Sequence, residues 1–342
     1  MQKKRVKKRS VSRTFPQCIS LLVTSALVVL VAGTSHSEEI PAAPPGTFSI
    51  VVLPDSQAYT TERDEDRHLF RAEIQWVIDH RESQKIVFVS HVGDVVPDDA
   101  EIYWNVAAQE MELLHGKVPY GISVGNHDMQ CPSGDSSLFQ ATFPASKFED
   151  FAWYGGQLKN NANSYQLFSA EGCNFIILHL ECNAPDPVLE WANKILRDHL
   201  DRRAIVTTHM YLGPLEKPKT GDDYFHAPKG RMLWKKCHRS EGNTPQQLWD
   251  KCLRKHPHIF MVLCGDQSRT QAMHRKVEGD AGNVVHEVLS DYRQGYLRLM
   301  RFEPAKNRIH VWTYSPYLKQ LCGGTSIVTD PNAHEFTLSL ND

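Results

Sequence analysis

The chain has 342 residues, of which 38 are Lys or Arg, 40 are Asp or Glu, and 41% are hydrophobic. This composition is ordinary for a globular protein, and we find no internal repeat or low-complexity tract. The length suits one large α/β domain with a sizeable core.

The first 37 residues have the order typical of a secretory signal peptide. Seven Lys or Arg and no acidic residue lie in residues 3–13, and an apolar stretch follows from Ile19 to Gly33. This stretch is shorter than the roughly 20 residues of a membrane-spanning helix. We therefore expect cleavage after residue 37 and export to the periplasm or the extracellular space. The alternative is an uncleaved anchor, which would be the only contact with the membrane.

Removing residues 1–37 takes away seven of the 38 basic residues and no acidic residue, so 31 basic residues face 40 acidic ones and the net formal charge is about −9. Such an acidic surface repels a polyphosphate backbone at long range. We expect no nucleic-acid partner, whereas a local metal site can still hold a small phosphoester.

Seven cysteines remain in the mature chain, so at least one is unpaired or pairs between chains. No C-x-x-C occurs, which argues against a thiolate zinc site. Export permits disulfides, but the sequence leaves their pairing open. Cys264 ends an apolar run, and we expect it to be a buried free thiol.

After a Pro-rich linker at 38–46, the expected domain covers 47–342 and opens with apolar runs that each end in polar residues. Such runs are typical of buried strands, and they cover 48–53, 85–90, 118–124, 203–208 and 259–264. Helical patterns with one apolar face lie between some of them, at 70–78 and 188–196. This alternation predicts βαβ units, which place the carboxyl ends of the strands, and any ligand site, at one edge of the sheet.

The pattern changes from Val284 onward, where strand-like runs follow one another without helices between them. They predict an antiparallel second sheet packed on the first. The segment 213–243 is rich in Gly, Pro, Lys and Asp and has no clear period. We expect a long loop there, close to the site, because long loops in compact domains are often functional.

Residue types that bind hard cations follow several of the predicted strands. Asp55 and Gln57 point the same way, since residues two apart share one side of an extended chain, and can chelate one ion. Asp94 follows a glycine and is the natural carboxylate to bridge two ions roughly 3.5–4 Å apart. Asn126 offers an amide oxygen and His209 an imidazole nitrogen.

The ordered set D-x-Q, G-D, G-N-H-D and a lone His after a strand resembles the calcineurin-like metallophosphoesterase superfamily over roughly residues 47–315. The resemblance implies a four-layer α/β/β/α sandwich. It also implies two divalent metal ions and a general acid. The first ion would be held by Asp55, Gln57 and Asp94 and the second by Asp94, Asn126 and His209, with His127 protonating the leaving group.

Two positions depart from the pattern of the superfamily. The usual D-x-H ends in Gln57 here, and the usual G-H-x-H reads Gly265-Asp266-Gln267-Ser268. Asp266 can still bind a metal, whereas Ser268 is a poor ligand, so we expect a weaker first site. The oxygen-rich set favours Mn, Mg or Fe over Zn. His274 can replace the histidine ligand that Ser268 lacks only if the loop between Asp266 and His274 folds back.

Four further residues have assigned or alternative roles in this interpretation. Asp128 is expected to orient the ring of His127, the candidate general acid, and to raise its pKa. Arg269 and His226 are candidate substrate-binding residues, and His91 either supports the site from behind or is structural.

Together these features predict an exported metal-dependent phosphoesterase. It would hydrolyse a small phosphate mono- or diester by attack of a metal-bound hydroxide, without a covalent intermediate. The alternative is a non-catalytic binding protein that keeps the fold after losing histidine ligands. A serine hydrolase is disfavoured because the chain has no G-x-S-x-G.

Overall fold

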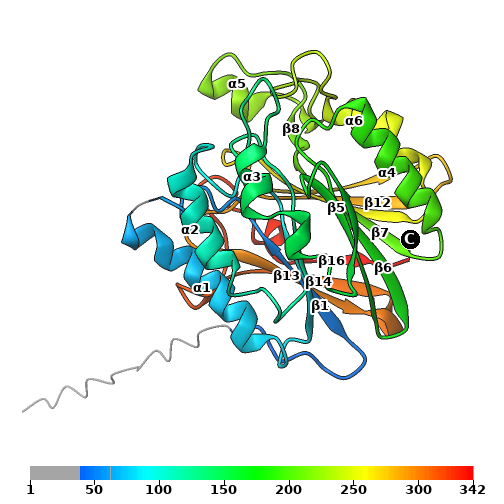
Figure 1. Cartoon of the computed structure of the whole chain (residues 1–342). Helices are drawn as coiled ribbons and strands as arrows, with labels where there is room; N and C mark the ends of the chain where they lie inside the picture. Colours follow the sequence, from blue (N-terminus) through cyan, green and yellow to red (C-terminus); the bar gives the residue numbers. More distant parts are fainter. Residues whose placement is uncertain (1–38, 62, 342) are drawn as a thin grey trace, which may run out of the picture. The chain divides into compact units, whose positions relative to one another are not determined.

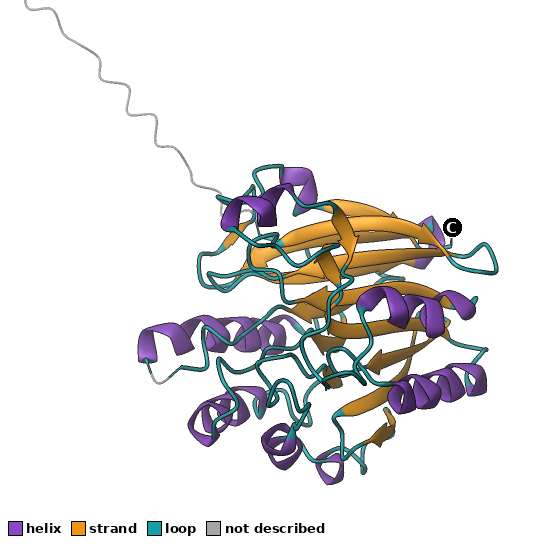
Figure 2. Cartoon of the chain, turned by 90° about the horizontal axis from the view of Figure 1, so that it is seen from above, coloured by secondary structure: helices purple, strands orange, loops and turns teal. Residues whose placement is uncertain are grey.

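The computed structural model describes residues 39–61 and 63–341, which form two mixed β-sheets flanked by helices. Figure 1 shows helices α1 and α2 on one side of the strands and α4 and α6 on the other, and Figure 2 shows the two sheets as stacked layers. The predicted signal segment lies outside the described residues. Within these residues, no helix is both long and apolar enough to cross a membrane.

The first sheet has the strand order β15-β14-β13-β1-β2-β3, with β16 paired to β14. Its strands are β1 (Phe48–Leu53), β2 (Ile86–His91), β3 (Tyr120–Ile122), β13 (Leu297–Glu303), β14 (Arg308–Ser315), β15 (Gln320–Leu321) and β16 (Phe336–Ser339). The strands β1, β2 and β3 run parallel.

The second sheet has the order β11-β12-β10-β7-β6-β5-β4, and β8 pairs with β9 in a separate two-stranded sheet. These strands are β4 (Tyr154–Leu158), β5 (Asn163–Ala170), β6 (Cys173–His179), β7 (Arg203–Met210), β8 (Leu212–Pro214), β9 (Lys229–Arg231), β10 (Ile259–Gly265), β11 (Ala272–Glu278) and β12 (Val284–Ser290). Within it β6, β7, β10 and β12 run parallel.

The helices occupy the connections between strands. They are α1 (Asp64–His80), α2 (Glu101–Met111), α3 (Ser137–Thr142), α4 (Asp186–Asp198), α5 (Gly221–His226) and α6 (Pro245–Lys251). Short 3₁₀ turns cover Ala145–Lys147, Leu253–Lys255, Pro304–Lys306 and Pro331–Ala333. The apolar faces predicted at 70–78 and 188–196 both fall on helices, α1 and α4.

The alternation of side chains along each strand builds three apolar layers. In β1, Val51 and Leu53 pack in a cluster with α1 and α2, whereas Ile50 and Val52 face the second sheet. The opposite face of the second sheet packs on α4 and α6. Because both faces of both sheets are covered, the central strands are continuously apolar, and the predicted four-layer α/β/β/α sandwich is confirmed.

The prediction of a separate antiparallel sheet after Val284 is wrong. Instead, β12 joins the second sheet parallel to β10, with Cys264 opposite Leu289, and β13 joins the first sheet antiparallel to β1. Every residue of β13 is buried, as expected for a central strand. Strand patterning reports burial on both faces, but it does not say which of two sheets a strand enters.

Two segments predicted to be irregular are more ordered than expected. The segment 213–243 contains most of β8, the helix α5 and β9. Residues 39–46 of the predicted linker pack on the domain: Ile40 is buried, and its carbonyl accepts a hydrogen bond from Gln84. The Pro41 carbonyl accepts another from Arg301.

Candidate metal centre

Five predicted ligands gather at the carboxyl edge of the two sheets. Asp55, Asp94 and Asn126 lie on the loops that follow β1, β2 and β3, His209 is the penultimate residue of β7, and Asp266 directly follows β10. Parallel strands bring their carboxyl ends to one edge, and the two sheets share this edge. The site therefore joins loops from both sheets.

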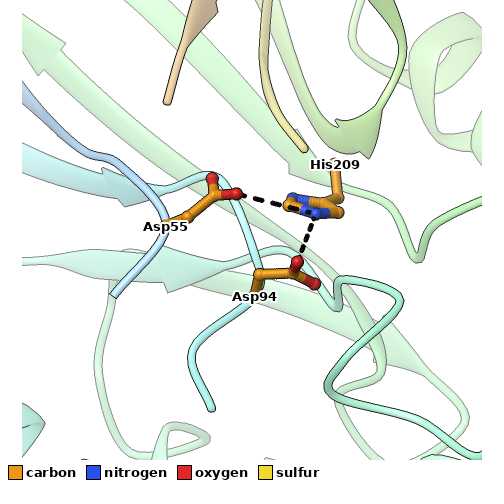
Figure 3. Close-up of side chains that lie close together, drawn as sticks. All are labelled: Asp55, Asp94 and His209. Atoms are coloured by element: carbon orange, nitrogen blue, oxygen red, sulfur yellow. Dashed lines mark ion pairs between the residues drawn. The ribbon is translucent and has the colours of Figure 1, made fainter. Parts of the chain in front are cut away.

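The closest grouping consists of Asp55, Asp94 and His209, which are all buried (Figure 3). One possible ligand atom from each lies within 4.8 Å of the others. His209 Nε2 is 3.0 Å from Asp94 Oδ2, 3.9 Å from Asp55 Oδ2 and 3.7 Å from Asp266 Oδ1. The imidazole nitrogen thus faces three carboxylates.

The hydrogen bonds of His209 determine which of its nitrogens is available. Nδ1 lies 2.9 Å from the carbonyl oxygen of Val92, which can only accept, so Nδ1 carries a proton. The buried Nε2 lies 3.0 Å from Asp94 Oδ2, whereas the buried Asp55 Oδ1 has no hydrogen-bond partner. An unprotonated Nε2 would direct its lone pair at carboxylate oxygens, so the arrangement requires a proton or a metal cation between them. This donor set fits a divalent cation, and Asp55, Asp94 and His209 would hold it.

Burial and neighbouring charges shift the pKa values of the side chains at the centre. Burial opposes the charged form of His209, but Asp94 and Asp55 outweigh it and raise the pKa of His209 well above its usual range. Burial and the neighbouring charge of Asp291 raise the pKa of Asp55. Burial also raises the pKa of Asp291, to about 7. Without a cation, the folded centre therefore retains protons that free side chains would release.

The backbone around the ligands is shaped to bring the loops close together. Asp94 and Asp266 have φ angles of 50° and 68°, in the left-handed region that non-glycine residues rarely adopt. A Cβ on Gly125 would lie 2.1 Å from Asp94 Oδ1, and one on Gly265 would lie 2.1 Å from Asp55 Oδ1. Gly125 and Gly265 are therefore required, because a side chain at either position would collide with a ligand.

Gln57 and Asn126 also reach the centre. Gln57 donates through Nε2 to Asp94 Oδ2 at 3.2 Å. With its amide nitrogen directed at Asp266, Asn126 donates to Asp266 Oδ1 at 2.6 Å and accepts from Lys236 Nζ at 2.6 Å. In the reverse orientation, two oxygens would lie against each other and would need a shared cation.

His127 lies at the half-buried edge of the centre. Its backbone N–H donates to Asp94 Oδ1 at 2.9 Å, and its Nδ1 donates to the carbonyl of Pro97 at 2.7 Å. The second nitrogen, Nε2, is therefore the one available for proton transfer.

The prediction that Asp128 orients the ring of His127 is wrong. Asp128 is fully buried and accepts hydrogen bonds from the backbone N–H groups of Val95, Val96 and Gly125 at 2.8–3.1 Å. It fastens the loop after β2 to the loop after β3. Burial and the charge of Asp94 raise the pKa of Asp128 to about 7.

Arg269 and His226 show no contact with the ligands above in the described part of the chain. The Arg269 guanidinium lies 5.2 Å from the centre of the Tyr224 ring. His226 ends α5 and lines an open cavity with Glu216 and Lys219. Their roles in substrate binding remain predictions.

Two other histidines have structural surroundings. His91 is fully buried and bonds Ser56 Oγ at 3.0 Å, and burial lowers its pKa to about 3. His274 lies on β11, stacks on Phe336 and pairs with His286 at 3.2 Å. It does not fold back toward Asp266, because the β11–β12 pairing fixes it in the second sheet.

Sequence reasoning missed four residues around the centre. Gln267 donates to Asp266 Oδ2 at 2.6 Å and accepts from the hydroxyl of Tyr224. Lys236 reaches Asn126, and Asp291 directly follows β12. The signal for Asp291 was the polar ending of the run at 284–289, but that run was assigned to a separate sheet.

A disulfide joins Cys131, just beyond G-N-H-D, to Cys237, next to Lys236. It ties the segment 213–243 to the metal centre across 106 residues of sequence. Cys264 is buried and unpaired, as predicted.

Comparison with known proteins gives distant matches. No protein-family model matches the chain. The chain is 31% identical over 316 residues to the uncharacterized protein YvnB of Bacillus subtilis (strain 168), a match that covers 89% of this chain and 22% of YvnB. The chain thus spans less than a quarter of that relative.

Three solved structures match the chain, each with a TM-score of 0.43. The NAD nucleotidase NadN of Haemophilus influenzae is 12% identical, covering 81% of this chain and 48% of its own. The 5'-nucleotidase precursor of Thermus thermophilus is 13% identical, covering 86% and 55%. GAP50, the anchor in the inner membrane complex of Plasmodium, is 11% identical, covering 86% and 89%. At this distance the matches carry no functional argument, which rests on the site itself.

Proposed function

We propose that the chain is an exported, metal-dependent phosphoesterase. The observation that carries this proposal is the Nε2 of His209, buried among the carboxylates of Asp55, Asp94 and Asp266. Burying several carboxylates together is costly unless a cation compensates them. Carboxylate, amide and imidazole ligands together suit the divalent ions that act on phosphoesters.

The metal supplies a defined part of the chemistry. When bound, a divalent ion polarises a phosphoryl oxygen and makes water a better nucleophile near neutral pH. Asp55, Asp94 and His209 would hold one ion, with Gln57, Asn126 and Asp266 completing a pair of sites that share Asp94. The oxygen-rich set favours Mn²⁺ or Mg²⁺ over Zn²⁺.

The remaining side chains bind the substrate and move protons. The Lys236 ammonium, 2.6 Å from the Asn126 amide, places a positive charge where phosphoryl oxygens would enter. His127 is held through Nδ1, so a protonated ring presents Nε2–H to the leaving oxygen. Asp128 keeps the loops that carry Asp94 and His127 in register.

Export is part of the proposal. The disulfide between Cys131 and Cys237 supports it, because disulfides persist in oxidising compartments and are rare in the cytosol. The charge pattern of residues 3–33 points the same way.

A panel of phosphate mono- and diesters tests the proposal on mature protein that has been stripped of metal and then reconstituted. We expect no turnover after chelation and better recovery with Mn²⁺ or Mg²⁺ than with Zn²⁺. Full activity of the stripped protein would refute it.

A second candidate is a non-catalytic binding protein, favoured by one contact. Gln57 turns its amide nitrogen, which cannot bind a metal, toward Asp94. On this alternative, the metal-loaded protein binds phosphoesters in calorimetry but turns none of them over.

A further inference from the structure

Asp291 lies at the sheet edge that carries the metal centre, at the end of a strand that the resemblance did not include. It is the first residue after β12, just as Asp266 is the first residue after β10. The two strands are parallel neighbours, with Cys264 opposite Leu289. Both carboxylates therefore leave adjacent strands at the same edge of the sheet.

The side chain of Asp291 has no partner of its own. The residue is 4% exposed, and its backbone N–H donates to the carbonyl of Gln271 at 2.9 Å. Across residues 39–61 and 63–341, no hydrogen bond or ion pair satisfies its carboxylate. The register of β10 and β12, in which Cys264 lies opposite Leu289, continues to place Asp291 beside Asp266 just beyond the two strand ends.

The charge at the centre points to a ligand. The imidazole of His209 faces the carboxylates of Asp55, Asp94 and Asp266, and Asp291 adds a fourth buried acidic residue at the same edge of the sheet. The buried Nε2 of that imidazole lies 3.0 Å from Asp94 Oδ2, and the buried Asp55 Oδ1 has no hydrogen-bond partner. Lone buried carboxylates are costly, and a polyvalent cation is the partner that compensates several at once.

We propose that Asp291 is a further metal ligand that takes over the position left open by Ser268. Ser268 lies on the turn beyond Asp266, where the superfamily pattern has a histidine, and its hydroxyl is a weak ligand. A carboxylate from the neighbouring strand restores both the ligand and a negative charge. The change replaces a nitrogen ligand by a carboxylate oxygen. Oxygen ligands suit hard cations such as Mn²⁺ and Mg²⁺. This inference rests on the proposed metal site.

Two variants of the full mature chain test it, with Mn²⁺ alone as the probe. Asp291→Asn keeps the size of the side chain and removes the charge, and Ser268→Ala is the matched control at the position that Asp291 replaces. In Mn²⁺ titrations we expect Asp291→Asn to weaken one bound ion by roughly 10- to 100-fold. Ser268→Ala should bind Mn²⁺ as the unmodified protein does.

Thermal unfolding separates a ligand from a structural residue. Without metal, Asp291→Asn removes repulsion between carboxylates, so its Tm should equal or exceed that of the unmodified protein. With saturating Mn²⁺, its gain in Tm should be smaller. Unchanged Mn²⁺ affinity and stoichiometry in Asp291→Asn would overturn the inference, as would a loss of binding in Ser268→Ala alone. Failure of the unmodified protein to bind Mn²⁺ would refute the proposed function itself.

Discussion

The two sheets contribute loops of different character to the metal centre. On the first sheet, the loops after β2 and β3 are fastened together by the three backbone hydrogen bonds of Asp128 and by the bond from His127 N–H to Asp94. On the second sheet, the loops after β10 and β12 bring Asp266 and Asp291, and the carboxylate of Asp291 has no partner among the described residues.

This difference separates two tasks. The first-sheet loops are held by hydrogen bonds within the protein, so their geometry exists before any ion binds. The second-sheet loops carry surplus negative charge, so their stability depends on the ion. We infer that the first sheet fixes the geometry of the centre and that the second sheet makes the centre depend on the ion.

The largest effect is expected on the first-sheet side. Asp94→Asn can keep the hydrogen bond from His127 N–H through its remaining oxygen but loses the charge that would be shared between ions. Loss of several kcal/mol of metal-dependent stabilisation should reduce turnover by about 10³-fold or more and lower the metal content. Asp98→Asn, in the same loop and exposed, is the control. If metal content and rate both survive in Asp94→Asn, this residue does not bridge.

His127→Ala should be selective for the leaving group. An alkyl alkoxide needs a proton in the transition state, whereas a nitrophenolate tolerates its charge. With metal content unchanged, we expect alkyl esters to slow by about 10²–10⁴-fold and nitrophenyl esters far less. Rates for both ester types in one preparation provide the comparison. An equal loss on both would remove His127 from the acid role.

Lys236→Met tests the segment that the disulfide brings to the centre. A charge-assisted hydrogen bond contributes about 1.5–3 kcal/mol, so KM for a phosphomonoester should rise roughly tenfold or more. Steady-state kinetics measure this, with Lys235→Met as the matched control. Lys235 is the preceding residue, and its Nζ bonds the Ser240 carbonyl instead of Asn126. Equal effects of the two substitutions would indicate a general surface charge.

The smallest effect concerns the pH dependence of the metal-free protein. Burial raises the pKa values of Asp291 and Asp128 from 3.8 to about 7. Between about pH 4 and 7 these two groups therefore bind protons in the folded state that they have released in the unfolded state, and their contribution to stability falls as pH rises. The slope is on the order of 1 kcal/mol per pH unit for each proton.

Denaturant unfolding in the presence of a chelator should therefore show that the unmodified protein loses more stability between pH 5 and pH 8 than Asp291→Asn does. The buried histidines with lowered pKa values, such as His91, contribute equally to both proteins and cancel in this comparison. Adding Mn²⁺ should reduce the difference, because the ion stabilises the ionised carboxylates. The same change in stability between pH 5 and pH 8 in Asp291→Asn and in the unmodified protein would contradict the raised pKa of Asp291.

The sequence by itself determined the strands that carry the first-sheet ligands. Short apolar runs that end in Asp55, Asp94 and Asn126 report burial and a strand end at once, and both are local properties of the chain. The helices α1 and α4 were predictable for the same reason, because each shows one apolar face.

Only the tertiary structure decided how the strands were shared between two sheets. It also decided the positions of Asp291 and Lys236 and the hydrogen bonds of Asp128. A fully buried strand has the same pattern in either sheet, so β12 and its terminal carboxylate could not be assigned from sequence. Lys236 reaches Asn126 from 110 residues away, next to the disulfide between Cys131 and Cys237. Asp128 lies next to His127 in sequence, yet its carboxylate turns to the backbone of Val95 and Val96. Buried N–H groups there need an acceptor, and that need becomes visible only once the loops are packed.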